Sequence, residues 1–156
     1  EMIIYKDSCY SFRIDEIDAP YRDIVMGNDS LAGMKSALDG CKAFYSLPDG
    51  FFTEKWICSL QENVMDGIVS GMAGGIRKKA LLMHPHIVLY MQQYNPPPHE
   101  EIDKLLQDLI KYVAADYSVD ILVKAALLYY QFETIHPFNI GNGRAGRLLP
   151  AALLKF

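Results

Sequence analysis

Residues 136–147 read His-Pro-Phe-Asn-Ile-Gly-Asn-Gly-Arg-Ala-Gly-Arg and separate two apolar stretches of the chain. The residue before Pro137 is disfavoured in helical conformation, so a helix preceding this stretch is predicted to end there. A second apolar helix is predicted to begin after Gly143. The Gly-Asn-Gly turn lets backbone amides point inward together, and the N-terminus of the second helix adds partial positive charge. The stretch therefore predicts an anion site with room for a polyphosphate.

The side chains of the same stretch add charge and a base. Arg144 and Arg147 lie three residues apart, so both project from one side of the first helical turn. His136 lies at the rim of the turn, where a neutral imidazole can take a proton from a hydroxyl group that attacks a bound phosphate. Phe138 is predicted to anchor the loop in the core. Taken alone, His136 also fits a core histidine before an ordinary turn, but the whole combination favours a catalytic site.

Three helices are predicted upstream of this stretch. Residues 119–134 are apolar almost all round, with Ser118 as the expected N-cap, so this helix is predicted to be central and buried on all sides. Residues 102–113 carry an apolar stripe at helical spacing behind a run of prolines. Thr53 is the expected N-cap of an amphipathic helix that stops at Gly67.

Shorter elements are predicted between and before these helices. Residues 80–83 and 87–91 are two β-prone runs about Pro85, which suggests a small hairpin or two extended segments. A short helix is predicted over 31–38, between turns rich in glycine and proline. The predicted fold class is therefore all-α, a helical bundle with a small β-hairpin.

Composition and charge narrow the class of protein. The chain has 156 residues, of which 51% are hydrophobic and 22% charged, so a globular domain is expected rather than a disordered or collagen-like chain. A net charge of -4 argues against a dedicated nucleic-acid-binding protein. No run approaches the ~18 consecutive apolar residues of a membrane span, so no membrane partner is expected.

Cysteine usage and the first residues bear on location. Cys9, Cys41 and Cys58 are widely spaced without a Cys-x-x-Cys pair, so neither a disulfide framework nor a zinc site is expected. The first residues lack the basic and apolar regions of a signal peptide. We therefore expect a cytoplasmic location of bacterial type, with a secreted effector whose signal lies outside these residues as the open alternative.

The stretch 136–147 resembles the signature of Fic-domain proteins, His-Pro-Phe-x-Asp/Glu-Gly-Asn-Gly-Arg-x-x-Arg. The residues before it, 131–135, are similar to the family's approach helix, and 75–77 and 95–98 resemble its upstream landmarks. The resemblance covers roughly 30–156, which leaves 1–29 as an N-terminal extension. Because the last residues still have the pattern of an apolar helix, we expect the C-terminal part of the domain to be missing.

This resemblance implies a mostly helical fold and transfer of AMP from ATP to a Ser, Thr or Tyr hydroxyl of a target protein, with magnesium. His136 would be the general base that deprotonates the hydroxyl. The backbone amides of the Gly-Asn-Gly turn and the Asn142 side chain would hold the α- and β-phosphates, and two arginines would neutralise the outer ones. These nucleotide-binding positions are Gly141, Asn142, Gly143, Arg144 and Arg147.

The resemblance also implies protein partners. The extended stretch near 77–83 would be the family's flap, which aligns a segment of the target by strand addition, with Arg77 and Lys78 as candidate contacts. The family often pairs, so a homodimer is a further expectation. No nucleic-acid partner is expected.

One position departs from the family pattern. The acidic residue before Gly-Asn-Gly, which ligates magnesium in the family, is Ile140 here. Isoleucine has no oxygen, and magnesium prefers hard oxygen ligands, so metal binding would rest on the triphosphate and water. We expect adenylyl transfer that is slowed, altered or absent. Two alternatives stay open: a nucleotide-binding regulatory module without chemistry, and transfer from another phosphate-containing donor.

A second, shorter stretch resembles the family's inhibitory helix motif, Ser/Thr-x-x-x-Glu-Gly/Asn. In that motif the glutamate pairs with the last arginine of the signature and misplaces the γ-phosphate. Here Asp39 replaces the glutamate and Lys35 stands at the Ser/Thr position. Because Asp is one methylene shorter, a bidentate pair with Arg147 is harder to close. A plain helix C-terminus ended by Gly40 is the alternative.

Overall fold

The computed structural model describes residues 52–65, 73–81, 94–115 and 118–155, together with Tyr10 and Ile14. Within these ranges it contains four α-helices, α4 (Glu54–Met65), α6 (Ile102–Ala114), α7 (Ile121–Ile135) and α8 (Asn142–Lys155). A short 3-10 helix, η2 (His99–Glu101), leads directly into α6. The predicted all-α class is confirmed.

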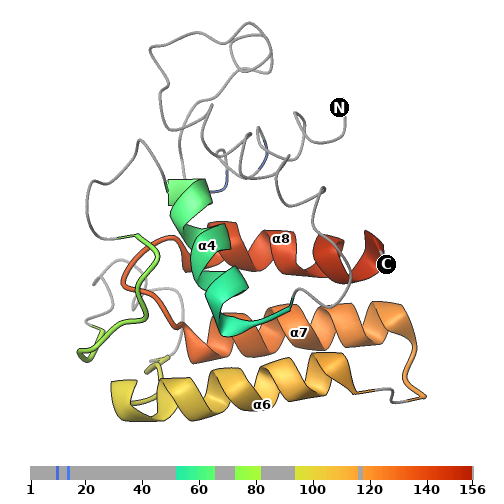
Figure 1. The fold of residues 1–156 in the computed structure, drawn as a ribbon, viewed down its shortest axis with the longest axis horizontal. Helices are drawn as coiled ribbons and strands as arrows, with labels where there is room; N and C mark the ends of the chain where they lie inside the picture. Colours follow the sequence, from blue (N-terminus) through green and yellow to red (C-terminus); the bar gives the residue numbers. More distant parts are fainter. Residues whose placement is uncertain are drawn as a thin grey trace, which may run out of the picture.

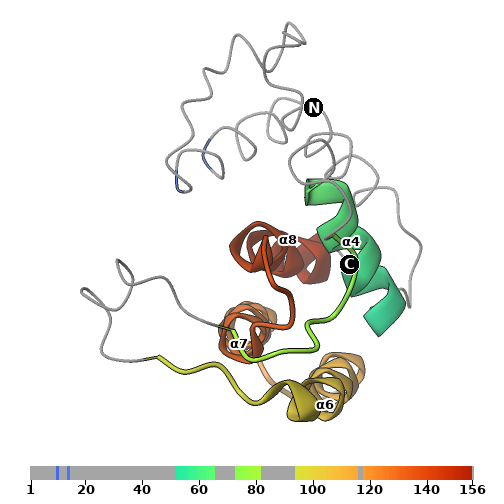
Figure 2. The ribbon, with the colours of Figure 1, turned by 90° about the vertical axis from the view of Figure 1, so that its left-hand side faces the viewer.

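The helices α6, α7 and α8 lie side by side, with α7 in the middle (Figure 1). Helix α4 crosses one face of this row and packs against α8 and α6 (Figure 2). The chain passes from α7 to α8 through a tight turn over residues 136–141. The turn therefore lies at one end of the row, next to the extended segment 73–81.

The hydrophobic core lies where the four helices meet. Helix α6 buries the predicted stripe, with Ile102, Leu106 and Leu109 against its neighbours. Helices α4, α7 and α8 contribute further buried apolar side chains, and Phe138 joins the same cluster from the α7–α8 turn. Because the turn has a side chain in the core, the helix packing and the position of the turn depend on each other.

The predicted β-hairpin is not confirmed. Residues 73–81 contain one isolated bridge, between Ile76 and Phe138, and the described ranges contain no named strand. The second β-prone run lies outside the described residues. So do the short helix expected at 31–38 and the inhibitory position Asp39.

The prediction that α7 is buried on all sides is wrong. Its buried residues form one stripe, Ala125, Leu128, Phe132 and Ile135. Leu122 and Tyr130 are 64% and 63% exposed. A helix that is apolar all round carries no period that selects one side, so packing decides which side is covered. None of the helices in the described ranges is both long and apolar enough to cross a membrane.

The structure confirms one predicted helix cap and corrects another. Oγ1 of Thr53 accepts a hydrogen bond from the amide of Trp56 at 3.2 Å, as expected for the cap of α4. The cap of α7 is Asp120 and not Ser118, because Oδ1 of Asp120 accepts from the amide of Leu122 at 2.8 Å. The helix starts two residues later than predicted because aspartate satisfies its first free amides.

Replacing the cap should weaken the fold, and replacing the residue that was wrongly expected to be the cap should not. We expect Asp120→Ala to lower the free energy of unfolding by about 1 kcal/mol, the usual value of an N-cap hydrogen bond. The matched control Ser118→Ala should stay within about 0.5 kcal/mol of wild type. Urea unfolding followed by circular dichroism measures both. A larger loss in Ser118→Ala would show that the helix begins where the sequence suggested.

Candidate active site

The turn between α7 and α8 begins with a residue in an unusual backbone conformation. His136 caps the C-terminus of α7 in the left-handed region, with φ 49° and ψ 61°. Among the described residues it is the one non-glycine residue with positive φ. A side chain with a Cβ disfavours this region, and such conformations persist where surrounding contacts hold them. The chain therefore changes direction at the residue that was predicted to act as the base.

The ring of His136 is held by the last turn of α7. Its Nδ1 lies 3.3 Å from the carbonyl oxygen of Glu133. With the proton on Nδ1, the ring donates to this carbonyl and Nε2 keeps its lone pair. Burial lowers the pKa of His136, the hydrogen bond to Glu133 opposes the shift, and the charge of Arg77 lowers the pKa further. The ring is therefore neutral near pH 7 and able to accept a proton.

Asn142 closes the turn on itself. Its Oδ1 accepts from the amide of Phe138 at 2.9 Å, and its Nδ2 donates to the carbonyl of Phe138 at 2.8 Å. The side chain is 2% exposed. We expected the Asn142 side chain to hold phosphate, but both ends of its amide are engaged inside the loop. The ring of Phe138 lies in the core, 6.3 Å from the ring of Phe132.

The start of α8 has the features of an anion site. Helix α8 begins at Asn142, and the amide of Ala145 makes the first bond back, to the carbonyl of Gly141. The amides at the start of a helix have no partner inside the helix and carry its partial positive charge. Nη1 of Arg147 lies 3.0 Å from where a Cβ of Gly143 would be, so this guanidinium lies against the same first turn. Arg144 is half-buried.

Glycine is required at position 141 for two reasons. Its φ is +74°, which L side chains rarely adopt. A Cβ there would also lie 2.5 Å from Sδ of Met65, on α4. Helix α4 thus packs directly against the back of the turn.

Gln61 is a site residue that sequence reasoning missed. It is fully buried on α4, its Nε2 donates to the carbonyl of Ile140 at 3.0 Å, and its Oε1 accepts from the amide of Gly74. It therefore joins the extended segment 73–81 to the signature turn. The sequence did mark this residue: Gln61 is polar but lies four positions after buried Ile57, on the apolar face of the helix.

Arg77 does not have the environment expected of a target-facing residue. It is 1% exposed. Its guanidinium donates to three backbone carbonyls, those of His136 at 2.9 Å, Lys79 at 3.2 Å and Pro97 at 2.6 Å. The expectation that Arg77 contacts a target is corrected, because its donors are committed to the protein's own backbone. Lys78 is exposed, and its contact with a target stays a prediction.

Glu133 is a second residue that sequence reasoning missed. Its carboxyl is partly buried, and burial raises its pKa while the charge of Arg147 lowers it. Its Oε1 has no hydrogen-bond partner among the described residues and lies so close to Gly146 that a Cβ there would collide with it. Gly146 therefore lets a carboxyl group approach α8 beside Arg147.

The described residues do not fit a magnesium ion held by the protein. Ile140 is half-buried and its side chain packs against the hydrophobic core. The neighbouring Asn139 is exposed. Within the described ranges no group of three or more His, Cys, Asp or Glu residues could hold a metal ion. An isoleucine turned into the core cannot supply the hard oxygen that magnesium needs.

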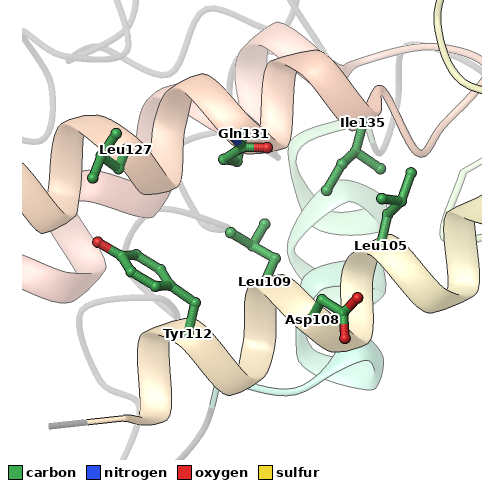
Figure 3. Close-up of a pocket in the computed structure, with 7 residues that line it drawn as sticks. All are labelled: Leu105, Asp108, Leu109, Tyr112, Leu127, Gln131 and Ile135. Atoms are coloured by element: carbon green, nitrogen blue, oxygen red, sulfur yellow. The ribbon is translucent and has the colours of Figure 1, made fainter. Parts of the chain in front are cut away.

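In the described part of the chain a groove lies between α6 and α7 (Figure 3). Its volume is about 300 Å³. The side chains that line it are largely apolar, with Asp108, Tyr112 and Gln131 among them. No residue of the signature turn lines it, and it lacks the amides and arginines that would hold a phosphate. The turn is therefore the better candidate for a site of phosphate chemistry.

Comparison with known proteins places this geometry in a family. A family model described as Fic/DOC family matches residues 51–154. A probable protein adenylyltransferase of Aquifex aeolicus is 25% identical over 143 residues, which cover 90% of this chain and 42% of that protein. A protein adenylyltransferase of Caenorhabditis elegans is 30% identical over 63 residues, 39% of this chain and 12% of that protein. The chain thus spans less than half the length of either relative.

Solved structures show the same fold. The crystal structure of a Fic family protein from Desulfovibrio desulfuricans has a TM-score of 0.80 at 22% identity, over 97% of this chain and 47% of that chain. A Fic domain containing signaling protein from Bacteroides thetaiotaomicron has a TM-score of 0.64 at 23% identity, over 79% of this chain and 47% of that chain. Identities this low relate the folds alone.

Because His136 is half-buried, its pKa should lie below the ordinary value of a histidine. We expect its imidazole to titrate below the ordinary value of about 6.5, measured by NMR of the ring nitrogens and assigned by loss of the signal in His136→Asn. The unfolded chain then binds this proton at higher pH than the folded chain. The linked stability is complete above about pH 6.5 and is lost as pH falls below it. His136→Asn should remove that part of the pH dependence, and titration above the ordinary value would contradict the half-buried, neutral ring.

Proposed function

The chain belongs to the Fic/DOC family, and from that premise we propose that it transfers AMP from ATP to a Ser, Thr or Tyr hydroxyl of a target protein. The observation that carries the proposal is the position of His136 at the rim of the turn into α8. Its Nδ1 is engaged with the carbonyl of Glu133, which leaves Nε2 available as a base in the turn that leads into α8.

The proposed reaction is a displacement at phosphorus. The hydroxyl oxygen of the target attacks the α-phosphorus of ATP, and the bond from that phosphorus to the bridging oxygen of the β-phosphate breaks. Pyrophosphate leaves with the electron pair of that bond. Nε2 of His136 takes the proton of the hydroxyl group. The products are a phosphodiester between AMP and the target, pyrophosphate and a protonated histidine that returns its proton to water.

The start of α8 would hold the phosphates. The amides of Asn142 and Gly143 lie in the first turn of α8, where a helix supplies no acceptor of its own, and the charge of Arg147 supports the same placement, with Arg144 as the second cation on the helix. Positioning and charge stabilisation of this kind make up most of the catalysis of phosphoryl transfer. The Asn142 side chain contributes by holding the loop rather than by touching the nucleotide.

Ile140 favours a second candidate function. Because it packs into the core and offers no oxygen, the loop lacks the charge that would orient a metal-bound triphosphate. A regulatory module that binds nucleotide without transfer is consistent with that loss. Transfer from a different phosphate-containing donor is a further alternative. The retained His136 favours chemistry, since a binding module has little use for a base.

Transfer and binding can be separated with one matched variant. ATP labelled on the α-phosphate is incubated with wild type and with His136→Asn, with magnesium or manganese and a cell lysate as the source of targets. Asparagine tolerates the left-handed conformation but cannot take up the proton. Label on protein with wild type alone supports transfer. Binding of ATP without transfer of label supports the regulatory module. The absence of both ATP binding and label transfer excludes ATP as the donor.

Restoring the acidic residue should raise activity. We expect Ile140→Asp to increase the rate of AMP transfer by about tenfold or more, because a metal ion stabilises transition-state charge by several kcal/mol and about 1.4 kcal/mol is tenfold in rate. The increase should require magnesium. The control Ile140→Asn makes the same loss of apolar packing without the charge and should show no such gain. Equal rates in the two variants, with ATP still bound, would refute this role for position 140.

A further inference from the structure

The hydrogen bonds around His136 converge on a residue of the extended segment. We infer that Arg77 is a positioning residue for the catalytic base: its buried guanidinium holds the carbonyl of His136 and so sets the direction of the imidazole. This inference rests on the proposed function for the identity of the base. It concerns a residue that the sequence suggested for a different task.

Arg77 controls two successive peptide groups of the turn. Its Nε donates to the carbonyl of His136 at 2.9 Å, and its own backbone amide donates to the carbonyl of Pro137 at 2.9 Å. The carbonyl direction of a residue follows its ψ, so the bond to His136 selects the left-handed conformation with φ 49° and ψ 61°. In that conformation the chain leaves α7 sharply and the ring stays against the last helical turn.

The guanidinium also ties the turn to two other segments. Its Nη1 reaches the carbonyl of Lys79 at 3.2 Å, and its Nη2 reaches the carbonyl of Pro97 at 2.6 Å. Only arginine presents donors in a planar fork that can reach three carbonyls from one buried point. Lysine would keep the charge but lose this geometry. The fork therefore explains why an arginine, and not simply a cation, is buried here.

Burying a charged guanidinium this completely costs free energy. This cost argues that the arrangement of its hydrogen bonds has a role in the site. Arg77 is 1% exposed, and each of its side-chain hydrogen bonds in the described part of the chain ends on a backbone carbonyl. Carbonyls satisfy the donors without neutralising the charge. Such a residue fits a role in which the orientation of the three carbonyls matters.

The first test compares variants by the step they affect. We expect Arg77→Lys to lower kcat for AMP transfer by about 100-fold, the usual effect of displacing a reacting group by about 1 Å. The affinity for ATP should be unchanged, because the amides of α8 remain. The matched control Thr134→Val removes a hydroxyl hydrogen bond to the carbonyl of Tyr130, near the same end of α7, without touching the carbonyls of Glu133 or His136. It should keep the wild-type kcat.

A second measurement covers the outcome in which Arg77→Lys does not fold. In wild type, the Nε proton of Arg77 should exchange with solvent far more slowly than that of an exposed arginine, and its NMR signal should show a coupling to the carbonyl carbon of His136 across the hydrogen bond. Rapid exchange, or no coupling, would overturn the inference. So would a folded Arg77→Lys variant with wild-type kcat, or one that loses ATP affinity and kcat together.

The same measurements separate this inference from the proposed function. If wild type transfers no AMP, the proposed function fails. The inference is then decided by the ring signals of His136, which should move in folded Arg77→Lys and stay in place in Thr134→Val. Unmoved His136 signals in Arg77→Lys would show that Arg77 is merely structural.

Discussion

The pair of hydrogen bonds between the Asn142 side chain and the backbone of Phe138 is the constraint on which the site depends. By satisfying the amide and the carbonyl of one residue, it closes the turn and presses the ring of Phe138 into the core. The same closure brings Asn142 to the position where α8 begins, so the first turn of that helix follows the turn directly. Two helices, the loop and the proposed anion site thus share one small polar contact.

The other buried polar side chains serve the same turn. Within the described residues, the buried polar or charged side chains are Gln61, Arg77 and Asn142. Gln61 holds the carbonyl of Ile140, Arg77 holds the carbonyl of His136, and Asn142 holds Phe138. They come from α4, the extended segment and α8. Buried polar groups are costly unless satisfied, and here each one makes at least one hydrogen bond to the backbone of the signature loop.

Position 140 shows how this turn differs from the family pattern. An acidic residue there would point an oxygen at the nucleotide, whereas Ile140 packs its side chain against the core and leaves only its carbonyl in polar contact, with Gln61. The loop keeps its shape because that shape depends on Asn142, Gly141 and the buried side chains rather than on the acid. Shape and metal binding are therefore separable in this loop, and the loss of one does not imply loss of the other.

Local patterns in the chain were enough to predict the four described helices and the turn between α7 and α8. The stripe in α6, the stop before Pro137 and the glycines of the turn are properties of residues close together in sequence, so their spacing reports them. Contacts between distant segments decided the rest: the covered side of α7 and the hydrogen bonds of Gln61 and Arg77. The bond from Gln61 to Ile140 spans 79 positions and that from Arg77 to His136 spans 59. Every residue carries a carbonyl, so the acceptor that a buried donor finds leaves no mark in the sequence and is selected only when the chain has folded.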